Sequence, residues 1–186
     1  MTDPSSTHEQ RRFERIGGEV LHEGRVLTLV EDRFRFADGA EVGREIVRTT
    51  GAVGMLVHDG THLILVRQPR EAIDDPDSLE IPAGRLDKDG EAPLDTAKRE
   101  LAEEVGFAAE HWQPMLRFQP SVGILSETVH LFCAHGLSEE QADSGEDERI
   151  ELVRWPLADL DGAIDACQDA KTLIGLLELR RRQGAA

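Results

Sequence analysis

Apolar and polar residues alternate through the first part of the chain. Between residues 18 and 50 an apolar side chain recurs at nearly every second position, and "HEG" and "ADG" interrupt the alternation. A period of two is typical of half-buried strands, and short stretches with glycine mark the turns between them. We therefore expect a small antiparallel sheet over residues 18–50, preceded by a polar, flexible tail at residues 1–17.

Beyond residue 50 the pattern predicts buried strands mixed with helices. "GAVGMLVHDGTHLILVRQ" predicts a hairpin that turns at "HDG", and "SLEIPAG", "ETVHLFCAHGL" and "RIELVRWPL" predict further strands. Apolar residues follow helical spacing over about residues 93–105, 157–168 and 170–182. Strands outnumber helices, which favours the α/β class, as a layered sandwich with a mixed sheet over residues 51–186.

The charge of the chain limits its partners. Asp and Glu number 37 and Lys and Arg 21, which gives a formal net charge of −16. This balance would repel a nucleic-acid backbone or an anionic membrane surface, so we expect neither as a partner. It would also repel an anionic small molecule, unless metal ions or a few arginines reverse the local sign.

The sequence favours a cytoplasmic protein. It has no apolar run near the roughly 18 residues of a membrane span, and its polar start lacks the apolar region of a secretory signal. Cys133 and Cys167 have neither the spacing of a metal site nor the number needed for a disulfide framework. We expect both to be reduced thiols.

Acidic residues cluster on the helix predicted at 93–105. At about 100° of rotation per residue, Glu100, Glu103 and Glu104 share one arc of the helix, next to an arc of apolar residues. Like charges at these spacings cost a few tenths of a kcal/mol per pair. The cluster is therefore either a solvated helix face or a site for cations. Carboxylates are the hard oxygen ligands that Mg²⁺ and Mn²⁺ prefer.

The residues around this cluster resemble a known signature. "PAGRLDKDGEAPLDTAKRELAEEVGF" resembles that of the Nudix hydrolases, which runs Gly, five residues, Glu, seven residues, Arg-Glu, an apolar residue, any residue, Glu-Glu, any residue, Gly and an apolar residue. Every position from Glu91 to Phe107 matches. Upstream, six residues separate Gly84 from Glu91, so the loop between them is one residue longer than in the signature.

The resemblance implies an α/β/α sandwich and a metal-dependent hydrolase. It implies two to three Mg²⁺ or Mn²⁺ ions, with Glu100 and Glu104 as ligands, Glu103 assisting and the backbone carbonyl of Ala83 completing the set. Such ions neutralise and polarise a pyrophosphate and lower the pKa of a bound water. Arg99 is grouped with the catalytic residues because a forked contact can hold a carboxylate in place, and the resemblance implies that Arg99 and Glu91 are both structural.

Other segments resemble the ADP-ribose pyrophosphatase branch of this family. "LVRQPREAIDD", "LEIPAGRLD" and "DAKTLIGLLEL" resemble its phosphate-binding strand, the turn before its acidic helix and its closing helix. The resemblance implies that Arg67 and Arg70 contact substrate phosphates and that Glu80 helps to bind the nucleoside side. Two surface arginines at a strand end are the alternative. It also implies that the N-terminal sheet forms an intertwined homodimer.

Two loops bear on specificity and on the general base. In "PSVGILSE", Gly123 and Glu127 match the branch as substrate contacts, but Val122 stands where the branch has a proline. The branch carries its base on a mobile loop, which makes Glu148 the first candidate here and Glu146 the second. A solvated run of charge is the alternative for this loop.

The expected substrate is a small nucleotide, and the expected reaction is hydrolysis of ADP-ribose to AMP and ribose 5-phosphate. Val122 favours an alternative, a pyrophosphatase for another nucleoside diphosphate sugar such as a UDP-sugar or GDP-mannose. A ligand sensor with this fold and no catalysis is a further alternative, although such sensors usually lose acids that this chain keeps.

Overall fold

The computed structural model describes residues 12–140 and 149–184. Contacts divide the chain into two compact units. The N-terminal unit consists of Met1–Thr49 with Ser121–Glu127, and the main unit consists of Thr50–Pro120 with Thr128–Ala186. The sequence interpretation had assigned the segment 121–127 to the main domain. It belongs to the N-terminal unit because Val47 exchanges backbone hydrogen bonds with Ile124 (2.8 Å) and Ser126 (2.9 Å).

The N-terminal unit is an antiparallel sheet of three strands. Its strands are β1 (Phe13–Glu23), β2 (Thr28–Phe36) and β3 (Glu41–Arg48), in the order β1-β2-β3. β1 begins at Phe13 instead of at the expected residue 18. The Phe13 ring meets the rings of Phe34 and Phe36 on β2, with centroids 5.4 and 6.0 Å away, and these contacts favour an earlier start of the strand.

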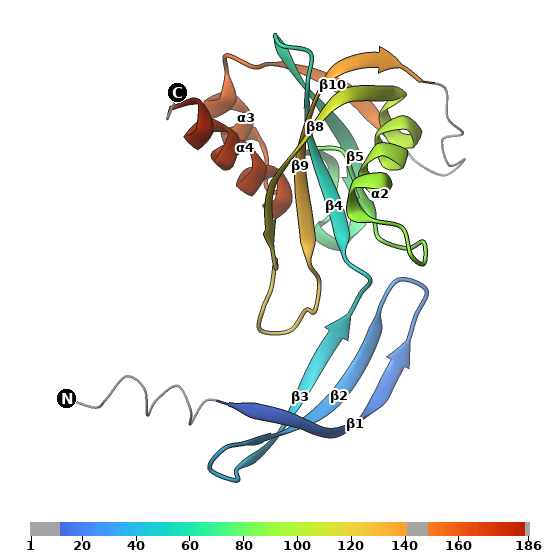
Figure 1. Ribbon diagram of the computed structural model, residues 1–186, viewed down its shortest axis with the longest axis vertical. Coiled ribbons are helices and arrows are strands. Elements are labelled where there is room, and N and C mark those ends of the chain that lie inside the picture. Colours follow the sequence, from blue (N-terminus) through green and yellow to red (C-terminus); the bar gives the residue numbers. More distant parts are fainter. Residues whose placement is uncertain (1–11, 141–148, 185–186) are drawn as a thin grey trace, which may run out of the picture. The chain divides into compact units, whose positions relative to one another are not determined.

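The main unit contains a mixed sheet with the strand order β10-β5-β4-β9-β8 (Figure 1). β4 and β9 are parallel, and the other neighbouring pairs are antiparallel. The short strands β6 and β7 pair with β5 and β4. The bounds are β4 (Ala52–His58), β5 (His62–Arg70), β6 (Asp75–Glu80), β7 (Ala83–Arg85), β8 (Phe107–Phe118), β9 (Val129–Glu139) and β10 (Glu151–Pro156).

Helices cover both faces of this sheet. α2 (Pro93–Glu100) continues into a π-helical turn, η2 (Leu101–Val105), on one face, and α3 (Leu160–Ala166) and α4 (Ala170–Gln183) lie on the other (Figure 1). Because successive side chains of a strand point to opposite faces of the sheet, each central strand contributes to the core on both faces. Leu56 on β4 joins the core cluster of Leu176 on α4, whereas its neighbour Met55 joins that of Leu101 on η2. The predicted α/β/α sandwich with a mixed sheet is therefore confirmed.

Several elements of the main unit differ from the sequence pattern. The strand expected at "SLEIPAG" ends before Pro82, as expected, but a second short strand, β7, follows the proline and was not predicted. α3 begins only at Leu160, because the Asp159 side chain caps it by accepting a hydrogen bond from the Gly162 amide. β8 was not predicted; it is an edge strand with an irregularity between Pro114 and Leu116.

The helices of the described residues are also short. Among these residues, no helix combines the length and the apolar character that crossing a bilayer requires. The 14 residues of α4 include three consecutive arginines near its end. A short 3₁₀ turn, η1 (Glu71–Ile73), connects β5 to β6.

Candidate active site

The acid helix, defined here as α2 and η2 together, presents its glutamates beside a buried face. Ala97, Leu101 and Val105 are buried in the core. Pro93 opens the helix, and Gly106, with φ of 73°, ends it in a left-handed conformation that favours glycine. Glu100, Glu103 and Glu104 therefore lie along the edge of the helix that faces out of the core, as the helical spacing predicts.

Arg99 donates hydrogen bonds to three carboxylates at once. Its Nε and Nη2 donate to the two oxygens of Glu91 at 3.2 and 3.1 Å. Its Nη1 donates to Glu100 and to Glu103, each at 2.8 Å. The hydrogen bonds from Arg99 are the main reason that the pKa of Glu91 is lowered. This arrangement can hold the rotamers of the acids beside the helix, and the role expected for Arg99 stays a prediction.

The backbone before the acid helix packs directly against two of its glutamates. The Ala83 amide donates to Glu104 Oε2 at 3.0 Å. A Cβ at Gly84 would lie 2.1 Å from Glu100 Cδ, so Glu100 occupies the space that a side chain at position 84 would need. The Pro82 carbonyl accepts from the Met55 amide at 2.9 Å, which ties this segment to β4. Ala83 thus lies beside both predicted metal-binding acids.

The electrostatics of these acids favour a cation. Burial raises the pKa of Glu100; Arg99 opposes that shift, and Glu103 adds to it by repulsion. A divalent cation would relieve this unfavourable environment, and carboxylate oxygens are suitable ligands. In the described part of the chain no three acidic, histidine or cysteine side chains already converge as a metal site.

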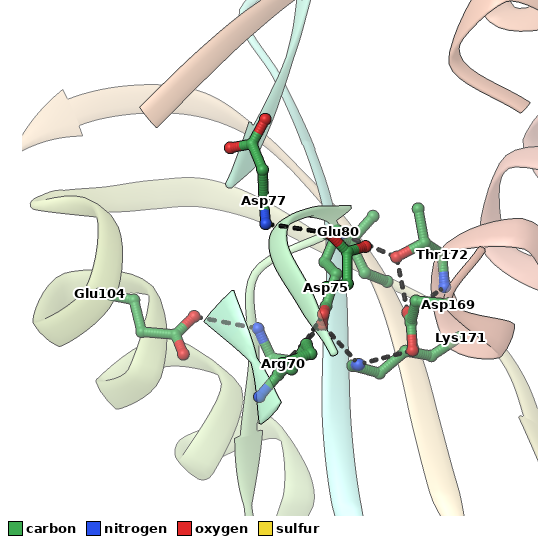
Figure 2. A network of polar contacts seen from close by, with 10 residues as sticks. Arg70, Asp75, Asp77, Glu80, Glu104, Asp169, Lys171 and Thr172 are labelled. Carbon is green, nitrogen blue, oxygen red and sulfur yellow. Dashed lines mark hydrogen bonds and ion pairs between the residues drawn. The ribbon is translucent and has the colours of Figure 1, made fainter. Parts of the chain in front are cut away.

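A second polar cluster surrounds Glu80 at the end of β6 (Figure 2). Arg70 Nε and Nη2 donate to the two Glu80 oxygens at 2.6 Å each, and Lys171 Nζ donates to Oε2 at 2.9 Å. The Glu80 side chain is only 2% exposed. Burial by itself would raise the pKa of Glu80, but the two cations outweigh it and lower the pKa to about 2. Glu80 is therefore a buried anion that fixes Arg70.

The start of α4 completes this cluster. The Asp169 carboxylate accepts from the Thr172 amide at 2.9 Å and from its hydroxyl at 2.7 Å, and from Lys171 at 2.9 Å. The Thr172 hydroxyl in turn accepts from the Ile81 amide at 2.9 Å. Sequence reasoning did not assign these residues. The available signal was an aspartate three residues before a threonine at the start of an apolar periodic run, which is the pattern of a capped helix.

Arg70 connects the two clusters. Figure 2 shows the Glu104 carboxylate extending from the acid helix toward Arg70, on the side away from α4. Both Glu80 and, more weakly, Glu104 raise the pKa of the Arg70 guanidinium. The structure therefore brings together a predicted phosphate-binding arginine, a predicted nucleoside-side acid and a predicted metal ligand.

Comparison with known proteins decides the family. Residues 48–174 match the sequence profile of the family described as "NUDIX domain", which is more than half of the chain. The chain belongs to the Nudix family. The signature predicted from the sequence, from Gly84 to Phe107, lies within the matched region.

Relatives of this Nudix chain cover nearly its whole length. It is 36% identical to an "ADP-ribose pyrophosphatase" from Bacillus subtilis and 35% identical to a "Methanol dehydrogenase activator" from Bacillus methanolicus, each over 90% of this chain and 92% of the relative. A solved structure described as an "ADP compounds hydrolase" superposes with a TM-score of 0.84 at 25% identity, over 94% of this chain and 96% of the other. The predicted resemblance to this branch is confirmed.

The remaining residues predicted from the Nudix resemblance are distributed over the chain. Arg67 lies on β5, where its Nη1 donates to Asp77 Oδ2 at 2.7 Å. Gly123 and Glu127 lie in the segment that belongs to the N-terminal unit. Glu146 and Glu148 lie outside the described residues. All five stay predictions as functional residues.

Proposed function

We propose that this Nudix hydrolase cleaves the pyrophosphate of ADP-ribose to AMP and ribose 5-phosphate with the help of Mg²⁺ or Mn²⁺. The observation that carries the proposal is the packing of Glu100 and Glu104 against the Ala83–Gly84 backbone, with Arg70 fixed beside them. The alignment of 90% of the chain with an ADP-ribose pyrophosphatase supports the choice of substrate.

The metal site is proposed on the acid helix. Glu100 and Glu104 would hold the cations, with Glu103 and the Ala83 carbonyl completing the set, for two to three ions. Bound divalent cations neutralise the pyrophosphate charge and make a water a better nucleophile at neutral pH. When they bind, Arg99 would keep its two hydrogen bonds to Glu91 and so remain beside the acids that it orients.

Arg70 is proposed to bind a substrate phosphate. Its Nε and Nη2 are used on Glu80, whereas Nη1 is not part of that fork. The buried Glu80 carboxylate supports an indirect role at the substrate site, by keeping Arg70 in one orientation. Arg67 is proposed as a second phosphate contact, and it would leave Asp77, which is 62% exposed, to reach the substrate. These arginines would supply local positive charge in a protein of formal charge −16.

The general base and two further substrate contacts are proposed from the sequence alone. Glu148 is the first candidate for the base and Glu146 the second; both lie outside the described residues. Water adds to one phosphorus while the base takes its proton, and the phosphoanhydride bond breaks with the second phosphate as the leaving group. Gly123 and Glu127 are proposed to contact the substrate.

A cytoplasmic homodimer is proposed as the working form. Its support is the apolar surface of the N-terminal unit, where Phe13 is 64% exposed and Val122 is 84% exposed. A groove of about 350 Å³ in this unit is lined by Phe13, Phe34, Phe36, Val42, Arg44, Ile46 and the segment 122–126. A sheet this small is stabilised by covering its apolar face, which a second copy would do. The free cysteines Cys133 and Cys167 are consistent with a reducing compartment.

A second candidate substrate is another nucleoside diphosphate sugar. The observation that favours it is Val122 in place of the branch's proline. A panel of ADP-ribose, a UDP-sugar, GDP-mannose and a nucleoside triphosphate, each with Mg²⁺ and with products identified by ³¹P NMR, tests both candidates. We expect the highest kcat/KM with ADP-ribose. A higher value for another sugar nucleotide would replace the substrate, and ligand binding without turnover of any compound would favour a sensor.

A further inference from the structure

The start of α4 is linked to the segment that carries Ala83. Two connections run from this helix to the end of β6: Lys171 binds the Glu80 carboxylate, and the Thr172 hydroxyl accepts from the Ile81 amide. Asp169 fixes both side chains, because its carboxylate accepts one hydrogen bond from the Lys171 ammonium and another from the Thr172 hydroxyl. Asp169 and Thr172 are therefore connected to a backbone position two residues before Ala83.

The same short segment meets the acid helix on its other side. Ala83 donates to Glu104, and Gly84 packs against Glu100. Between these connections stands Pro82, whose ring restricts the backbone and whose carbonyl accepts from Met55. Proline fixes only φ at position 82, and Ala83 and Gly84 pair with β4. A displacement of Ile81 would therefore act on Ala83 and Gly84 by straining this pairing.

Burial makes the Thr172 hydroxyl hard to replace. Thr172 and Ile81 are both fully buried, with 0% of their surface exposed. Without the hydroxyl, the Ile81 amide would lose its acceptor in a place that water does not reach, and a buried unpaired donor is costly. The segment would then shift to find another acceptor.

We propose that Thr172, held by Asp169, is a positioning residue of the metal site. It fixes the segment 81–84 so that the Ala83 carbonyl and the Glu100 and Glu104 carboxylates are arranged to bind a divalent cation. This inference rests on the proposed function, because it assumes that these groups are the metal ligands. The competing explanation is that Asp169 and Thr172 merely cap α4 and stabilise the fold.

A matched pair of caps separates the two explanations. Asp159 caps α3 by accepting from the Gly162 amide, as Asp169 caps α4 by accepting from the Thr172 amide. Asp159→Ala and Asp169→Ala each remove one helix cap, but only Asp169 is connected to the segment 81–84. Thr172→Ser keeps the hydroxyl and Thr172→Val removes it at nearly constant volume.

The test is the affinity of these variants for Mn²⁺ without substrate, measured by electron paramagnetic resonance of the free ion. Groups that orient metal ligands typically change affinity by about 10-fold to 100-fold when removed. We expect a loss of about 10-fold for Thr172→Val and Asp169→Ala, and affinities close to wild type for Thr172→Ser and Asp159→Ala. Thermal melting shows that each variant is folded at the temperature of the measurement.

The outcomes distinguish this inference from the proposed function. Wild-type affinity in Thr172→Val, or an equal loss in Asp159→Ala and Asp169→Ala, would overturn the positioning role. If Thr172→Val does not fold, the pair of aspartate variants decides. If the wild type binds Mn²⁺ but does not hydrolyse ADP-ribose, the proposed substrate fails and the affinities still decide the positioning role. A wild type that binds no Mn²⁺ would overturn both.

Discussion

Gly84 and Glu100 lie so close together that a single added carbon would displace the carboxylate. A Cβ at position 84 would be 2.1 Å from Glu100 Cδ and 2.2 Å from its Cγ. Both are atoms of a flexible side chain, so the glutamate can rotate away while the backbone keeps its path. The glycine of the signature therefore creates the space in which a predicted metal ligand lies.

Gly84→Ala is expected to reduce activity much more than stability. Rotation of Glu100 would misplace one metal ligand by an ångström or more, and displacements of that size cost on the order of 100-fold in rate. We expect kcat/KM for ADP-ribose to fall by about that factor, with little change in melting temperature. Gly43→Ala is the matched control, because its Cβ would meet Glu31 Oε1 at 2.8 Å, far along the chain in the N-terminal sheet. Full activity in Gly84→Ala would contradict the assignment of Glu100.

Arg99→Lys is expected to be a damaging substitution despite its retained charge. One ammonium cannot reproduce the forked contact with Glu91 together with the bonds to Glu100 and Glu103. We expect kcat/KM to fall by about 10-fold and the metal-free protein to melt earlier, with saturating Mn²⁺ recovering part of the stability. Arg154→Lys, in which an arginine 62% exposed binds Asp59, is the control and should match wild type. Unchanged kinetics in Arg99→Lys would show that the fork has no role.

The sequence allowed the acid helix to be predicted because its evidence is local. Three- and four-residue spacings determine which side chains share a helix face, so Glu100, Glu103 and Glu104 could be grouped without knowing the fold. Pro93 and Gly106 likewise marked its ends. The strands with regular alternation were also predictable for this reason, whereas β8, interrupted at Pro114, was not.

The cluster around Glu80 could not be derived in the same way. Arg70 and Glu80 are ten residues apart, and Lys171 is 91 residues from Glu80. Their contacts depend on the pairing of β5 with β6 and on the packing of α4, which spacing along the chain does not determine. Resemblance identified Arg70 and Glu80 as site residues, but the burial of Glu80 and its pairing with Lys171 required the structure.

Binding of Mn²⁺ is expected to stabilise the folded protein through Glu104. A ligand at 100 times its Kd that binds only the folded state raises the free energy of unfolding by about 2.7 kcal/mol. For a chain of this size that corresponds to roughly 5 to 10 °C in Tm. We expect this rise in the wild type and little of it in Glu104→Gln, with Glu139→Gln, an exposed acid on β9, as the control. An equal rise of Tm in Glu104→Gln and Glu139→Gln would show that the metal binds at a site without Glu104.

Phe13→Glu is expected to disrupt the proposed homodimer. The Phe13 ring is 64% exposed and lies against Phe34 at the apolar groove of the N-terminal unit, so a charge there would oppose its burial against a second copy. We expect the wild type to sediment as a dimer and Phe13→Glu as a folded monomer. Leu177→Glu is the control, since this half-exposed leucine lies on α4. A monomeric wild type would overturn the proposal directly.

Glu80 is expected to make the protein sensitive to acid. Its folded pKa of about 2 lies below the ordinary value of 4.5, so its contribution to stability is present above pH 4.5 and is lost as the pH falls toward 2. The shift corresponds to about 3 kcal/mol of unfolding free energy. The free energy of unfolding, measured with denaturant, should change less between pH 7 and pH 3 in Glu80→Gln than in the wild type.

Kinetic measurements distinguish a specific role of Glu80 in holding Arg70 from a general contribution of acidic residues to stability. Glu178 also has a pKa lowered to about 2, mainly by its hydrogen bonds to Arg181 and Arg182, but it lies on α4 away from Arg70. Glu178→Gln should therefore keep its KM for ADP-ribose. In Glu80→Gln the Arg70 guanidinium loses its charged partner and its fixed orientation, and KM should rise by about 10-fold at pH 7. An unchanged KM in Glu80→Gln would contradict the role of Glu80 in holding Arg70 for the substrate.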